Sequence, residues 1–276
     1  MNGRIDWPAH VMLGLGVLLF ILPIWLVLAG ATLDPAAIAR GELSLVPRLD
    51  GWGVYAAVLA EGAPGAQPVG RMLLVSAGMA LAIAAGKIVI SILSAYAVTF
   101  FRFPFRMTAF WTIFITLMLP VEVRIMPTYS VMSDLSLINT FPGLTVPLIA
   151  SATATLLFRQ TFLAVPDELV EAARMDGAGP LRFLKDILIP VSAANLAALF
   201  VILFVYGWNQ YLWPLLVATN PRLDTIVIGI VKMIGTETQT EWNRVMATAV
   251  LALLPPVAVV VLMQRWFVKG LTEGEK

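Results

Sequence analysis

Six long apolar runs constrain this chain more than any other feature of its sequence. A helix rises about 1.5 Å per residue, so about 20 apolar residues cross the roughly 30 Å of hydrocarbon in a bilayer. The sequence predicts spans at about 11–32, 72–100, 107–127, 140–160, 191–217 and 245–268. The first run is long and lacks a small-residue cleavage site, which favours a retained span over a signal peptide. We therefore expect an all-α integral membrane protein with a single transmembrane domain, residues 1–276.

The composition fits a lipid-exposed chain and excludes several classes of function. Of 276 residues, 59% are hydrophobic and 13% are charged, whereas an ordinary soluble domain carries about 25% charged residues. The net charge of +1 argues against a nucleic-acid-binding surface. Because the chain has no cysteine, a disulfide framework, a zinc–thiolate site and a cysteine nucleophile are excluded. The single histidine, His10, is expected at the membrane interface.

Positively charged residues in the connecting segments indicate how the spans are oriented. With the N-terminus inside the cell, the cytoplasmic segments hold ten of the 18 Lys and Arg residues: Arg4, Arg102, Arg106, Arg159, Arg174, Arg182, Lys185, Arg265, Lys269 and Lys276. The outer segments are longer and hold seven: Arg40, Arg48, Arg71, Arg124, Arg222, Lys232 and Arg244. Lys87 lies within a predicted span. This bias predicts that both termini are cytoplasmic.

The segment 165–190, VPDELVEAARMDGAGPLRFLKDILIP, concentrates charge in a chain that otherwise avoids it. In a first short helix, acidic residues come early and Arg174 late, as the helix dipole favours. Gly177 suits the left-handed conformation that ends a helix, and Pro180 suits the first turn of a second helix. Pro190 breaks that helix before the fifth span. On composition alone, an ordinary charged cytoplasmic loop explains the segment equally well.

The residues of this segment resemble the EAA motif of ABC importer permeases: Glu-Ala-Ala, three residues, Gly, nine residues, Ile, one residue, Leu-Pro. The chain matches this spacing at Glu171, Ala172, Ala173, Gly177, Ile187 and Pro190. Ile189 replaces the leucine, a mild apolar exchange. The longer string EAARMDGA is similar to the carbohydrate-uptake branch of these permeases. We call residues 165–190 the EAA loop.

The resemblance implies that the EAA loop contacts an ATPase and couples hydrolysis to transport. The residues that it assigns to this contact are Glu171, Ala172, Ala173, Asp176, Gly177 and Ala178. The two alanines would leave a small face that another protein can approach closely. The glutamate would offer a carboxylate to a basic residue of the partner.

Further strings extend the resemblance over nearly the whole chain. VEVRIMPTY (121–129) and YGWNQYLWPLL (206–216) are similar to permease subunits of sn-glycerol-3-phosphate importers. The resemblance implies a type I ABC importer permease fold, with six transmembrane helices, cytoplasmic coupling helices and transport by alternating access. A permease for another sugar or polyol is the alternative, because a binding protein supplies most of the substrate selection in such systems.

The same resemblance implies a complex of five parts. The other four are a homologous second permease subunit, two copies of a cytoplasmic ATPase and a periplasmic substrate-binding protein. Membrane lipid would surround the spans, and no nucleic acid would be bound. The Walker A pattern G-x-x-x-x-G-K-[ST] does not occur in the chain. We therefore expect no cofactor in this chain, ATP and Mg being bound by the partner ATPase, and no catalytic residue or metal ligand.

Polar residues inside spans are costly and are therefore candidates for the substrate path. They are Lys87, Glu122, Arg124, Asn209, Gln210 and Tyr211. Lys87 could attract a phosphate, or it could be a structural cation paired to a carboxylate or a helix end. Glu122 and Arg124 could form an ion pair at the outer interface or contact the ligand. The amides of Asn209 and Gln210 need partners, which helix–helix hydrogen bonds could supply. Alternatively, they could line the path together with Tyr211.

Two other classes of function compete with transport. An integral membrane enzyme would need carboxylates, histidines or a nucleophile converging at the membrane surface, and the sequence offers no such cluster. A scaffold or receptor subunit is the second. Association with an ATPase and ATP-dependent uptake into liposomes would separate a permease from both.

Overall fold

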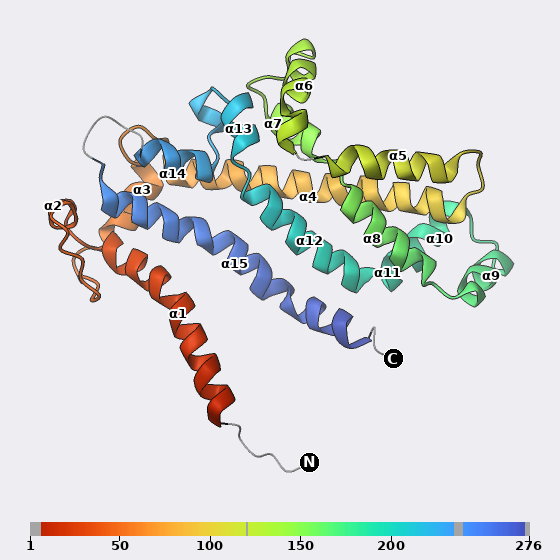
Figure 1. The fold of residues 1–276 in the computed structure, drawn as a ribbon, viewed down its shortest axis with the longest axis horizontal. Coiled ribbons are helices and arrows are strands. Elements are labelled where there is room, and N and C mark those ends of the chain that lie inside the picture. Colours follow the sequence, from red (N-terminus) through yellow and green to blue (C-terminus); the bar gives the residue numbers. More distant parts are fainter. Residues whose placement is uncertain (1–6, 120, 235–239, 274–276) are drawn as a thin grey trace. The chain divides into compact units, whose positions relative to one another are not determined.

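The computed structural model describes residues 7–119, 121–234 and 240–273, and its regular elements there are all helical (Figure 1). In chain order these are α1 (Trp7–Ala31), α2 (Pro35–Ala39), α3 (Gly53–Glu61), α4 (Val69–Phe100), α5 (Arg106–Met118), α6 (Val121–Asp134), α7 (Phe141–Thr145), η1 (Val146–Leu148), α8 (Ala152–Leu163), α9 (Asp167–Met175), α10 (Pro180–Phe183), η2 (Leu184–Leu188), α11 (Ile189–Val191), α12 (Ala193–Trp208), α13 (Leu212–Val217), η3 (Pro221–Leu223), α14 (Ile226–Ile234) and α15 (Trp242–Glu273). The prediction of an all-helical chain is confirmed for these residues.

Three helices are long and apolar enough to cross a membrane: α1, α4 and the part of α15 from Trp242 to Trp266. Two bent pairs of helices have this length and composition together. They are Phe141–Leu148 with Ala152–Leu163, bent by 50°, and Pro180–Val191 with Ala193–Trp208, bent by 78°. The described residues therefore hold three candidate spans, or five if each bent pair is one span.

The apolar run 107–127, predicted as the third span, is divided between two helices. α5 ends at Met118, and Leu119 takes an extended backbone with φ −61° and ψ 134°. Proline follows Leu119 in the sequence, and the residue before a proline is disfavoured in the helical region because the ring collides with its backbone. A hydropathy pattern does not register this interruption, because proline and its neighbours leave the run apolar.

The predicted fifth span, 191–217, is also divided. α12 ends at Trp208, and Asn209 caps it with its backbone N–H donating to the carbonyl of Val205. The chain then continues as the short helix α13 from Leu212. Asn209 and the two residues after it therefore lie outside any helix. The predicted span 191–217 had placed them inside one.

The chain forms two compact units, which are described separately. Unit 1 comprises residues 1–74 and 224–254, and unit 2 comprises residues 75–223 and 255–276. Within unit 2, α8 contacts α5 and α12, and α13 contacts α6 and α7 (Figure 1). α12 also approaches α4 closely, because a Cβ added at Gly207 would lie 2.9 Å from the Cα of Ala80. Helices in membranes often pack through small residues in this way.

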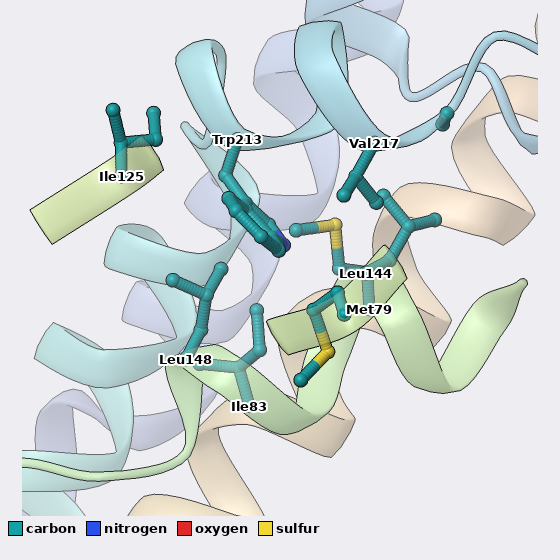
Figure 2. Close-up of a cluster of buried hydrophobic side chains, with 9 residues drawn as sticks. Met79, Ile83, Ile125, Leu144, Leu148, Trp213 and Val217 are labelled. Carbon is teal, nitrogen blue, oxygen red and sulfur yellow. The ribbon is translucent and has the colours of Figure 1, made fainter. Parts of the chain in front are cut away.

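A hydrophobic core in unit 2 gathers around the indole of Trp213 (Figure 2). Its buried members are Met79, Ile83, Ile125, Met132, Leu144, Leu148, Trp213, Val217 and Ala218. The indole N–H of Trp213 donates to the carbonyl of Gly143 over 3.0 Å, which satisfies the one polar group that this side chain buries. The core therefore fixes α13 against α7, directly after the interruption at Asn209.

Candidate coupling loop and substrate path

The first helix of the EAA loop, α9, has well-defined ends. Asp167 and Glu168 lie in its first turn and Arg174 in its last, which suits the helix dipole. At its C-terminus, Gly177 has φ 68°. Its N–H donates to the carbonyl of Arg174, and the N–H of Ala178 donates to the carbonyl of Ala173. This pair of bonds is a Schellman motif and confirms the predicted left-handed glycine.

The second part of the loop begins with Pro180 at the first position of α10, as predicted. A π-helical turn, η2, follows before Pro190. Proline lacks the N–H that would bond four residues back, and its ring crowds the preceding turn, so a widened turn at this place has a direct cause. The chain then bends by 78° into α12.

Aromatic side chains join the EAA loop to the end of α4. The hydroxyl of Tyr96 donates to the carbonyl of Pro180 over 2.9 Å. The aromatic cluster consists of Tyr96, Phe100, Phe101, Phe162 and Phe183, with ring centroids 5.2 to 6.4 Å apart in its contacts. Such contacts add to the burial of the rings. The loop therefore rests on α4.

The two alanines of the motif differ in exposure. Ala173 is buried, with 5% of its surface exposed, whereas Ala172 is exposed. The expected small face of two adjacent alanines is therefore wrong, because Ala173 packs against its own chain. Of the other motif residues, Glu171, Asp176 and Gly177 are exposed and Ala178 is half-buried.

A hollow of about 470 Å³ lies beside α9. Its charged lining consists of Arg102, Arg106, Asp167, Glu171 and Arg174. Two carboxylates and three guanidinium groups therefore surround it, and Glu171 stands at a surface where both signs of charge are present.

Lys87 is buried in the middle of α4, with 7% of its surface exposed. Its Nζ lies 4.1 Å from the centroid of the Tyr206 ring, which belongs to α12. The side-chain amide of Gln210 donates to the carbonyl of Tyr206 over 3.1 Å. The structure thus brings two of the predicted path residues, Lys87 and Gln210, to the same tyrosine.

Arg124 is half-buried on α6. It lines a small hollow with Thr128, Pro147, Leu148 and Trp213 among others. We call Lys87 and Arg124 the cation pair. The side chain of Glu122 lies outside the described residues, so its predicted ion pair stays a prediction.

The remaining predicted path residues lie at the interruption between α12 and α13. Asn209 and Tyr211 are exposed, and Gln210 is half-buried. The side-chain amide of Gln210 donates to the last turn of α12, the helix that precedes it, and not to a second helix.

Tyr96 and Tyr206 were not singled out from the sequence. Tyr206 precedes Gln210 by one helical turn, and Tyr96 precedes Phe100 by the same interval. This periodicity could have indicated a shared face. Their partners, however, lie far along the chain, and spacing does not reveal such contacts.

The chain belongs to a family of transport proteins. The family described as "Binding-protein-dependent transport system inner membrane component" matches residues 87–273. The chain is therefore a multi-pass inner-membrane permease component of a binding-protein-dependent ABC transporter, and not a catalytic subunit. This confirms the resemblance found in the EAA loop.

Several relatives carry the same more specific description. The "sn-glycerol-3-phosphate transport system permease protein UgpE" of Rhizobium meliloti (strain 1021) is 57% identical over 97% of this chain and 96% of its own. The protein so named in Agrobacterium fabrum (strain C58) is 58% identical, with the same two coverages. The one from Yersinia pestis bv. Antiqua (strain Antiqua) is 53% identical over 99% of this chain and 98% of its own.

A solved structure has the same fold. It is a chain of the crystal structure of a bacterial ABC transporter involved in the import of the acidic polysaccharide alginate. The TM-score is 0.81 over 94% of this chain and 95% of that chain, at 21% sequence identity. At this identity the likeness concerns the fold alone.

Proposed function

We propose that this chain is the permease subunit through which an ATP-driven importer moves sn-glycerol-3-phosphate, and glycerophosphodiesters with it, across the inner membrane. The observation that carries the proposal is the 57% identity to a permease of that name over 97% of this chain. Because the identity is this high over nearly the full length of both chains, we expect the two substrate paths to consist of largely the same residues.

The proposed architecture is that of a type I importer permease, with one transmembrane domain of six spans and both termini in the cytoplasm. α5 and α6 together would form the third span, interrupted after Leu119. The likeness to the alginate importer supports this fold. The excess of Lys and Arg in the predicted cytoplasmic segments supports the orientation.

The EAA loop is proposed to dock on the ATPase through Glu171, Ala172, Asp176, Gly177 and Ala178. Ala173, with 5% of its surface exposed, would lie under the docking surface. Its small side chain would let α9 pack closely against the rest of this chain. Two large apolar side chains of the loop are strongly exposed, Met175 at 89% and Leu181 at 77%. In the docked complex these two side chains would be covered by the ATPase.

The aromatic cluster would carry movement of the docked loop to α4.

The remaining partners are a homologous second permease subunit, a second copy of the ATPase and a periplasmic binding protein. ATP and Mg would be bound by the ATPase, and this chain would hold no cofactor. Its task would be to open the path alternately to the two sides of the membrane.

The test is uptake into liposomes by the complete reconstituted complex, with ATP inside and the loaded binding protein outside. We expect uptake of sn-glycerol-3-phosphate by the wild type. Glu171→Lys should insert normally but lower ATPase association and uptake several-fold, because it reverses the charge presented to the partner. Glu168→Lys is the matched control, since this exposed acid lies on the same helix outside the motif.

Uptake of another polyol instead of sn-glycerol-3-phosphate by the wild type would reject the substrate. Wild-type ATPase association in Glu171→Lys would reject the docking surface.

A further inference from the structure

Among the residues whose side chains the structure describes, the buried ammonium of Lys87 is compensated only weakly. Its side chain is 7% exposed, and the contact described for its ammonium is the face of Tyr206, at 4.1 Å from the centroid. An aromatic face attracts a cation, but more weakly than the water that a buried ammonium has lost. The ring orients the ammonium rather than neutralising it.

A second cation makes this arrangement more costly. Arg124, from α6, lines a hollow with Leu148 and Trp213, and these two share a buried core with Ile83, one helical turn before Lys87 on α4. Two positive charges close together in a medium of low polarity repel each other more strongly than in water. Negative charge brought to such a pair would stabilise it.

The sequence offers little negative charge of its own near the cation pair. Residues 75–166 contain two acidic side chains, Glu122 and Asp134, and residues 191–223 contain none. Asp134 lies ten residues beyond Arg124 on α6, about 15 Å along the helix axis. In the part of unit 2 that the structure describes, no ion pair joins Lys87 or Arg124 to a carboxylate. Of the acidic residues in these two segments, Glu122 is therefore the counter-charge that an experiment must address.

We propose that the cation pair, Lys87 and Arg124, is the binding site for the phosphate dianion of the substrate during its passage through the membrane. The inference rests on the proposed function and names the site where the charged group is held. Arg124 would supply a planar fork of donors that matches two phosphate oxygens. Lys87, aimed by Tyr206, would supply the second positive charge.

The position of the site fits a passing substrate. Lys87 stands on α4, which meets the EAA loop through the aromatic cluster, and Arg124 stands on α6, beside the core around Trp213. The two cations thus belong to different helices, and movement between α4 and α6 would change their separation. A site of this kind can hold a dianion in one state and release it in another.

The test uses the complete complex in liposomes and compares uptake with ATP hydrolysis stimulated by the binding protein. Lys87→Met and Arg124→Gln should each lower uptake of sn-glycerol-3-phosphate about tenfold or more, the effect of losing one charged hydrogen bond. Assembly and ATPase association should be unchanged. Lys87→Arg should restore much of the uptake. Arg71→Gln is the matched control, because this exposed cation lies on the same helix, and it should transport normally.

The pH dependence of uptake separates a phosphate site from a structural role. A phosphate monoester loses its second proton at a pKa of about 6. One remaining cation can compensate the monoanion better than the dianion, so variant uptake relative to the wild type should rise as the pH falls through that value. A constant ratio of variant to wild type would indicate a structural role and overturn the proposal.

The role of Glu122 is tested by the double variant Lys87→Met, Glu122→Gln. If Glu122 neutralises Lys87, removing both charges should restore uptake, and the proposal would be wrong. Continued loss of uptake supports the phosphate site. If the wild type and both single variants take up sn-glycerol-3-phosphate at the full rate, the phosphate site is wrong and the proposed function still stands. A wild type that does not take up sn-glycerol-3-phosphate would overturn the proposed function and the site with it.

Discussion

At Gly177 the backbone conformation, and not the available space, restricts the residue type. Its φ is 68°, and no neighbouring atom lies within 4 Å of the place where a Cβ would stand. Gly179, two residues on, also has open space there, but its φ is −68°. A comparison of alanine substitutions at the two glycines therefore separates backbone strain from every other effect of adding a methyl group to the EAA loop.

We expect Gly177→Ala to destabilise the local structure of the EAA loop by about 1–2 kcal/mol, the cost of a left-handed conformation for a residue with a Cβ. ATP hydrolysis stimulated by the binding protein should fall several-fold in the reconstituted complex. Gly179→Ala should hydrolyse ATP as the wild type does, because its φ is open to alanine. Equal rates in the two variants would contradict a role for the left-handed turn.

At the scale of elements, α4 and α12 are joined at the place where Gly207 faces Ala80. We expect Gly207→Ala to lower the free energy of unfolding by about 1–3 kcal/mol, because the added methyl group would overpack the contact. Thermal unfolding of the purified chain in detergent would measure this. Gly16→Ala in α1 is the control, since open space surrounds that position. Equal melting temperatures for the two variants would show that the helices tolerate a wider separation.

Local signals predicted the elements of the EAA loop well, because their causes lie within a few residues. Gly177 and Pro180 act on their own turns, and the structure has both where the sequence placed them. The interruptions at Leu119 and Asn209 were missed, since hydropathy averages over the residues that cause them. The contact of Lys87 with Tyr206 was also missed. It depends on the packing of α4 against α12, and the sequence contains no local trace of it.

At the scale of the whole molecule, the distribution of Lys and Arg predicts which side of the membrane each connection faces. A reporter fused after Lys276, a position outside the described residues, should be active only in the cytoplasm. A second reporter, one that works only outside the cell, should be active when it is fused after Arg48, in the first outer connection. Measuring both fusions in intact cells checks the orientation. Activity outside the cell for the fusion at Lys276 would reject an even number of spans with both ends inside.

The hydrogen bond from Tyr96 to Pro180 has a consequence for how sequences of this kind can vary. Tyr96 and Lys87 lie on one uninterrupted helix, nine residues or about 14 Å apart. One inserted residue between them would turn one side chain by about 100° relative to the other. The EAA loop would then lose its support, or Lys87 would leave the Tyr206 ring. This stretch of chain should therefore accept exchanges of residue type far more readily than any change of length.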